Sequence, residues 1–138
     1  MPKDYTWAGA IGEIDGLPLM MRVREVPKRA QVRKLFPHLV VITYAFETRS
    51  ATGLPSKREY TRLEKFEAAT FDALEAASGG LLVLVRTHRR QVEYYEYVAS
   101  VARAVKKIDH SALAGPISLA AAKNDRWKEY DRAWSQLH

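Results

Sequence analysis

Cysteine is absent from this chain of 138 residues. Disulfide bonds and thiolate metal sites are therefore excluded, which fits a protein that stays in the reducing cytoplasm. No apolar run approaches the roughly 20 residues that a membrane-spanning helix needs. The start of the chain, Met1–Trp7, also has no apolar segment of the kind found in secretion signals. We therefore expect a soluble cytoplasmic protein without a membrane partner.

The common motifs of catalysis and of phosphate binding are absent as well. The chain contains no Gly-x-Ser-x-Gly, no Gly-x-Gly-x-x-Gly and no phosphate-binding loop. The histidines have no partner at a recognised metal-ligand spacing; they are His38, His88, His110 and His138. We therefore predict no catalytic residue, no cofactor and no metal ion, and an enzyme is the less favoured interpretation.

Positive charge is what the chain has in excess. It carries 22 Lys and Arg against 16 Asp and Glu, which gives a net charge of +6. Such a basic protein can attract nucleic acid, anionic membranes or acidic partners. Dedicated nucleic-acid binders gather their charge in one patch or stripe, whereas here it is spread over short clusters. Charge alone therefore leaves nucleic-acid binding as an open alternative.

Hydrophobic periodicity predicts the order β-β, then β-α-β-β-α-β, then α. Asp15-Gly16 between two apolar runs is typical of a type I′ hairpin turn, and Ser56 with Glu59 is typical of a helix N-terminus. The expected strands are Tyr5–Ile14, Leu17–Val26, Leu39–Phe46, Leu81–Thr87, Gln91–Tyr97 and Ile117–Ala121. The expected helices are Lys57–Ala77, Val98–Ile108 and a last one that Asn124 or Asp125 caps.

This element order predicts one α+β domain over residues 1–138. Its core would be a ferredoxin-like βαββαβ unit with a mainly antiparallel sheet, an N-terminal β-hairpin and a C-terminal helix. Two strands, 39–46 and 81–85, are apolar on both sides, so both faces of the sheet need a cover. The helices of the unit cover one face. The hairpin, the last helix or a second subunit would cover the other, so a homodimer is one alternative.

Glu67 breaks the apolar face of the helix expected at residues 57–77. An unpaired carboxylate on such a face costs several kcal/mol. Glu67 is therefore either an acid in a binding pocket or a structural carboxylate bonded to the backbone, a tyrosine or an arginine. Both interpretations stay open from the sequence.

A second group of candidate binding residues follows from the tyrosine-rich strand at residues 91–97. Tyr95 and Tyr97 near Arg86 invite comparison with RNA recognition motifs, which stack bases on sheet aromatics. The typical Lys/Arg-Gly-Phe-x-Phe pattern is missing, and glutamates separate the tyrosines. Aromatic packing between strands is the alternative. The candidate binding residues are thus Glu67, Arg86, Tyr95 and Tyr97.

The order of several short motifs resembles the bacterial domain-of-unknown-function 695 family over almost the whole chain. The motifs are Asp15-Gly16, Gly53-Leu54-Pro55, the helix with Leu63, Phe66 and Glu67, Tyr94-Tyr95-Glu96-Tyr97, and Asn124-Asp125-Arg126-Trp127-Lys128-Glu129-Tyr130. The resemblance implies no activity. Domains similar to this family sometimes occur beside a domain resembling the regulator of ribonuclease activity, which implies protein or RNA regulation.

The sequence therefore favours a non-catalytic protein-interaction or regulatory domain. Its partner would be another protein or a second copy of the chain. The alternatives are an RNA-associated module and a small-molecule-binding domain with a pocket near Glu67. The C-terminal aromatic stripe, which includes Trp127, is expected either to dock on the body or to face a partner.

Overall fold

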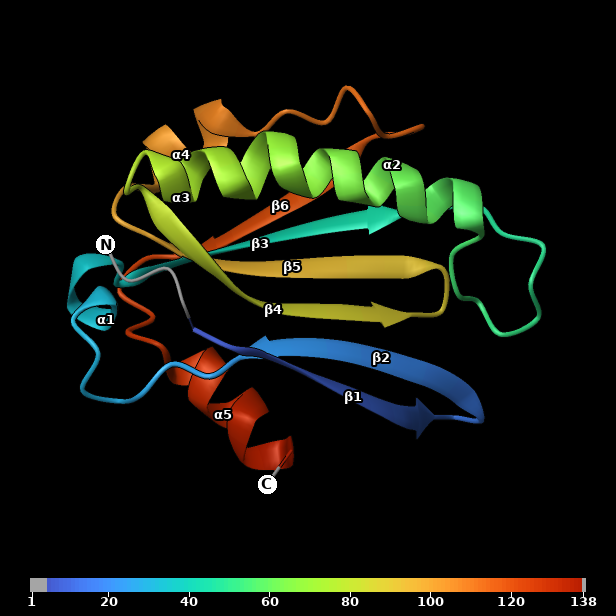
Figure 1. Ribbon diagram of the computed structural model, residues 1–138, viewed down its shortest axis with the longest axis horizontal. Helices are drawn as coiled ribbons and strands as arrows, with labels where there is room; N and C mark the ends of the chain where they lie inside the picture. Colours follow the sequence, from blue (N-terminus) through green and yellow to red (C-terminus); the bar gives the residue numbers. More distant parts are fainter. Residues whose placement is uncertain (1–4, 138) are drawn as a thin grey trace.

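The computed structural model describes residues 5–137, so Met1–Asp4 and His138 lie outside the described part. Six strands form one antiparallel sheet in the order β1-β2-β4-β5-β3-β6 (Figure 1). The strands are β1 (Trp7–Ile14), β2 (Leu17–Arg24), β3 (His38–Ala45), β4 (Gly80–His88), β5 (Gln91–Val98) and β6 (Ile117–Ala122). The helical segments are α1 (Val32–Leu35), α2 (Lys57–Glu67), η1 (Ala68–Asp72), α3 (Ala73–Ala76), α4 (Val101–Lys107) and α5 (Lys128–Leu137). No helix within residues 5–137 is long and apolar enough to span a membrane.

The α+β class and the antiparallel sheet expected from the sequence are confirmed. The ferredoxin-like arrangement is not confirmed, because the strand order of the whole sheet differs. The N-terminal hairpin, β1 and β2, does not cover a face. It continues the sheet sideways, with β2 paired to β4 and β1 at the outer edge (Figure 1).

Local sequence signals account for two of the boundaries. Asp15 and Gly16 both adopt positive φ, +52° and +79°, as a type I′ turn between β1 and β2 requires. At the start of α2, the Ser56 hydroxyl oxygen accepts a hydrogen bond from the Glu59 N–H at 3.2 Å. The predicted N-cap is therefore confirmed, while the Glu59 carboxylate accepts from Arg62 at 3.1 Å.

The helix expected over residues 57–77 is interrupted by one π-helical turn, η1, immediately after Glu67. A π-turn closes i→i+5 hydrogen bonds and is therefore wider than an α-turn. This widening lets Phe66 and Phe71, five residues apart, both pack into the core. Their ring centroids lie 5.6 Å apart in an edge-on arrangement, and both side chains are buried.

One face of the sheet is covered by α2, η1, α3 and α4. Its core joins Val40, Ile42 and Tyr94 of the strands to Phe66 and Leu74 of the helices. These residues alternate with those of the other face, as the period of two along a strand requires. The helical layer runs along the sheet next to β3 and β6 in Figure 1.

The other face is covered by the chain itself, through α1, α5 and the segment before α5 (Figure 1). Trp127 is completely buried and stacks on Tyr97 with ring centroids 4.3 Å apart. Its indole N–H donates to the Phe36 carbonyl oxygen at 2.9 Å. The last helix, one of the covers that the sequence left open, therefore packs on this face, and the aromatic residues Trp127 and Tyr130 dock on the body.

Candidate functional site: a groove between α2 and the N-terminal hairpin

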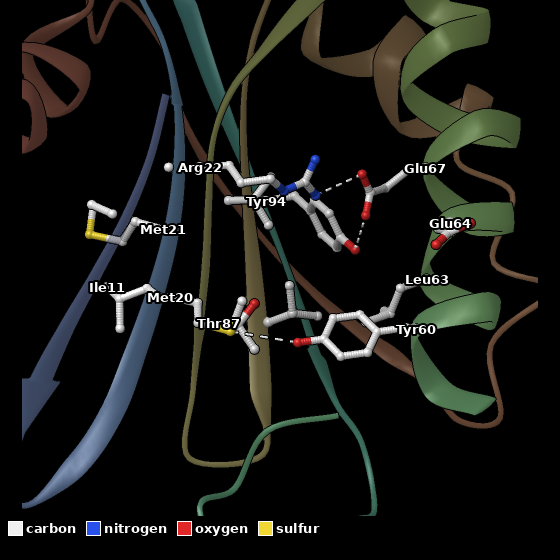
Figure 2. Close-up of a pocket in the computed structure, with 14 residues that line it drawn as sticks. Ile11, Met20, Met21, Arg22, Tyr60, Leu63, Glu64, Glu67, Thr87 and Tyr94 are labelled. Atoms are coloured by element: carbon white, nitrogen blue, oxygen red, sulfur yellow. Dashed lines mark hydrogen bonds and ion pairs between the residues drawn. The ribbon is translucent and has the colours of Figure 1, made fainter. Parts of the chain in front are cut away.

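A groove of about 730 Å³ runs between α2 and the N-terminal hairpin (Figure 2). Its floor includes Val85 and Val92 of the two central strands. Ile11 and Met20 line it on the hairpin side, and Leu63 lines it on the helix side. The groove is therefore mainly apolar along its length.

The width of the sheet explains why the groove exists. Six strands span roughly 24 Å between the outermost axes, at about 4.8 Å per spacing. Two helices side by side cover roughly 20 Å. In this protein α2 and α4 pack against β3, β4 and β5. The hairpin extends the sheet beyond this layer, so its inner face and the flank of α2 form the two walls of an open channel.

The polar end of the groove is built around Glu67. One carboxylate oxygen accepts a hydrogen bond from the Arg22 guanidinium at 2.8 Å, and the other accepts from the Tyr94 hydroxyl at 3.0 Å (Figure 2). Burial and, next, the negative charge of Glu67 raise the pKa of Tyr94, so its hydroxyl stays protonated and donates. Glu67 thus has the tyrosine and arginine partners of the structural interpretation, and it also lines the groove.

Two arginines of β2 flank one aromatic ring next to this end. The Arg22 guanidinium lies 5.4 Å from the centre of the Trp7 ring, and the Arg24 guanidinium lies 4.9 Å from it. Arg24 also pairs with Glu75 at 2.5 Å. A cation–π contact attracts the charge of the guanidinium to the ring without a hydrogen bond, and Arg22 uses one nitrogen, Nη2, for its bond to Glu67.

Tyr60 of α2 reaches across the groove towards the hairpin. Its hydroxyl donates to the Met20 sulfur at 3.6 Å (Figure 2). A thioether is a weak acceptor, so this contact costs little to break. Tyr60 and Met20 therefore form a bridge over the apolar part of the groove that a ligand can displace.

The four binding residues predicted from the sequence do not form one site. Glu67 lies on the groove face, whereas Arg86, Tyr95 and Tyr97 belong to the opposite face of the sheet. Burial and, next, the charge of Glu93 raise the pKa of Tyr95, and the positive charge of Arg86 partly offsets this. Tyr97 is completely buried beneath Trp127 and donates to the Asp125 carboxylate at 2.6 Å. Tyr97 therefore has no exposed face on which a base could stack.

Sequence reasoning missed the hairpin's contribution to the site. Leu19, Met21 and Val23 form the more apolar face of β2, so the period of two favours the solvent side for Arg22 and Met20. In the structure both faces of β2 are used, and Arg22 and Met20 line the groove. The signal available in the sequence was Glu67 itself, for which an arginine from elsewhere in the chain was one of the possible partners.

The buried acid Glu96 was also overlooked. Its side chain is only 2% exposed, and its Oε2 atom has no hydrogen-bond partner within the described residues. The alternation of β5 already places Glu96 on the same face as Val92 and Tyr94. Burial, and then the nearby charge of Glu75, raise the pKa of Glu96 well above 4.5. Glu96 does not line the groove.

Within residues 5–137, no group of three or more His, Asp or Glu side chains could hold a metal ion.

A model of the Family of unknown function (DUF695) matches residues 5–135, almost the whole chain. This match confirms the resemblance that the order of the motifs indicated. No curated protein and no solved structure matches the chain.

Proposed function

The chain belongs to this family of unknown function, and we propose that it is a non-catalytic binding domain that takes a small amphipathic molecule in the groove. The groove itself carries the proposal. Its volume, about 730 Å³, lies within the range of roughly 300–1,000 Å³ of small-molecule sites. Such sites have mainly apolar walls with a few convergent polar groups, and here Arg22, Glu67 and Tyr94 are those groups.

The π-helical turn next to the groove supports the same proposal. π-turns are rare and occur frequently at functional sites, and η1 begins at the residue after Glu67. The opposite face of the sheet offers less to a ligand, because α5 and Trp127 cover part of it. The RNA-associated module stays a prediction, with Tyr97 buried rather than available for stacking.

Binding of an uncharged probe tests this function. Calorimetric titration with 1-octanol should give saturable binding to the wild-type protein. Met20→Trp should abolish it, because the larger side chain fills the groove from the hairpin side. Leu19→Trp is the matched control, since the neighbouring residue of β2 points to the other face and should leave binding intact. Equal binding by the wild type and Met20→Trp would remove the groove as the site.

A second candidate function, interaction with a second copy of the chain, is favoured by the outer edge of β6. This strand has no charged residue and no proline, and it pairs with β3 without a bulge. Five of its six residues are exposed, including Leu119 at 45%. Edge strands without such protection are templates for strand addition. Antiparallel pairing of two β6 strands about a twofold axis would give a closed dimer.

Charge at this edge should control the association. Sedimentation analysis of the wild type at micromolar concentrations should give the mass of a dimer, and Leu119→Lys should give a monomer. Ile11→Lys, at the exposed outer edge of β1, is the control that should leave the dimer unchanged. A wild-type monomer under these conditions would contradict the proposal.

The finer description of the fold is also a proposal. Within the sheet, β5 separates β3 from β4, and β3 separates β5 from β6. In each pair of strands joined through a helix, β3 with β4 and β5 with β6, a third strand lies between the two. This order supports a ferredoxin-like unit that the hairpin extends. The cytoplasmic location and bacterial origin stay predictions.

A further inference from the structure

At the polar end of the groove, the oxygens of Glu67 have hydrogen-bond partners, whereas most N–H groups of Arg22 have none among residues 5–137. Both oxygens of the Glu67 carboxylate already accept hydrogen bonds, one of them from a charged guanidinium. The Tyr94 hydroxyl gives its only proton to Glu67, and its side chain is completely buried. Glu67, the acceptor of this cluster, therefore already has a cationic partner within the chain, Arg22.

Arg22 keeps most of its donors. A guanidinium has five N–H groups, and a single nitrogen, Nη2, bonds to Glu67. The contact with the Trp7 ring, at 5.4 Å from the ring centre, is a cation–π contact and uses no hydrogen bond of the group. The Arg22 side chain is 47% exposed although it lines the groove. Its remaining N–H groups are thus the strongest unused donors of the lining.

The other charged group of the lining lies apart from Arg22. Glu64 belongs to the described lining, but its carboxylate stays beside the helix in Figure 2, whereas Glu67 reaches towards the hairpin. Near Arg22, the second guanidinium, Arg24, lies over the same Trp7 ring. Arg24 is held by Glu75 and is not part of the lining, so Arg22 is the guanidinium that a negatively charged head in the groove would meet.

We propose that the natural ligand is an amphiphile with a carboxylate head and an unbranched or aromatic apolar body. The head binds the free N–H edge of Arg22, because a guanidinium matches the two oxygens of a carboxylate with parallel hydrogen bonds. The body lies on Met20, Leu63 and Val85 and displaces the weak contact of Tyr60 with the Met20 sulfur. This inference rests on the proposed function and adds the chemical class of the ligand.

Four probes that share an eight-carbon chain separate the head from the body. Calorimetric titration at neutral pH compares octanoate, octanamide, 1-octanol and octylamine on the wild-type protein. We expect octanoate to bind most tightly, the two neutral probes to bind more weakly, and octylamine to bind least. Octanoate ranks first because Arg22 offers free N–H donors. Octylamine ranks last because Glu67 already has a cationic partner, Arg22.

Substitution of Arg22 locates the head. Arg22→Met should weaken octanoate binding at least about tenfold, the effect of one hydrogen bond to a charged group. The same variant should keep its affinity for 1-octanol, which also shows that the groove has formed. Arg103→Met removes the same formal charge from the exposed side of α4 and should leave octanoate binding unchanged. If Arg22→Met does not fold, Arg22→Lys keeps the charge without the paired N–H groups and should still weaken octanoate binding selectively.

The outcomes distinguish the two levels of the proposal. Octylamine binding as tightly as octanoate, or octanoate binding that is insensitive to Arg22 substitution, overturns the carboxylate head while the groove function stands. Absence of 1-octanol binding to the wild type overturns the groove function and this inference with it. Preference for octanoate that Arg103→Met also abolishes would assign the effect to overall charge and would overturn the contact with Arg22.

Discussion

Replacing Trp127 by alanine should lower the free energy of unfolding by about 3–5 kcal/mol, the usual cost of deleting a buried aromatic side chain. The indole is completely buried, and it fills the space between the sheet and α5. It stacks on Tyr97 and donates to the Phe36 carbonyl oxygen. The Arg33 guanidinium also lies 4.9 Å from its ring centre. Alanine would lose all of these contacts and leave a cavity.

Denaturant unfolding of purified variants measures this effect. Trp127→Phe should lower the free energy of unfolding less than Trp127→Ala does, because phenylalanine keeps a ring against Tyr97. Some loss should remain, because the buried Phe36 carbonyl oxygen loses its donor. Leu35→Ala, at a half-exposed apolar position of α1, is the control and should change the free energy by less than about 1 kcal/mol. A loss for Trp127→Ala as small as that of the control would mean that the last helix does not contribute to the core.

Replacing Glu96 by methionine should stabilise the protein at neutral pH, and the gain should grow as the pH rises. Burial and the neighbouring Glu75 raise the pKa of Glu96 well above 4.5. A carboxyl group with a raised folded-state pKa contributes its full stability below the unfolded pKa. That contribution is lost as the pH rises towards and through the folded pKa. Methionine has no proton to lose, so the variant avoids this cost.

The size of the effect follows from linkage. Between pH 4.5 and the folded pKa of Glu96, the difference in unfolding free energy between the variant and the wild type should grow by up to about 1.4 kcal/mol per pH unit. Denaturant unfolding at several pH values from 4.5 to 8 gives this slope. Glu75, the charge that faces Glu96, is paired with Arg24 and is present in both proteins.

A core deletion on the same strand provides the control. Val98→Ala removes buried methyl groups and should lower the stability by a similar amount at every pH. Glu96→Gln tests the charge alone, because it keeps the shape of the side chain. If the stabilities of Glu96→Met and the wild type change in parallel with pH, Glu96 is not the buried acid that limits stability at neutral pH.

Local signals were sufficient where the physics is local. The Asp15-Gly16 turn requires positive φ at two adjacent residues, and the sequence places two tolerant residues there. Ser56 satisfies an N–H at the start of α2 within four residues of chain. The period of two along β5 already separates Tyr94 and Glu96 from Tyr95 and Tyr97. Each of these predictions depends on a few neighbouring residues.

The site could not be predicted in the same way, because its groups come from distant segments. Arg22 and Glu67 are 45 residues apart, and they meet only because β2 pairs with β4 and not with another strand. Nothing in either segment specifies that neighbour. The sequence identified Glu67 as an anomaly but could not say which cation it would meet, nor that the hairpin would form one wall of a groove.

The amino-acid sequence by itself determined the α+β class, the hairpin turn, the start of α2 and the two strands that need cover on both faces. These features follow from propensities, capping and periodicity, which act over one or two turns of chain. Only the tertiary structure decided that α5 covers the second face, that the hairpin widens the sheet and that a groove opens beside Glu67. Those outcomes depend on which strands become neighbours, and that choice minimises exposed apolar surface over the whole chain rather than within any one segment.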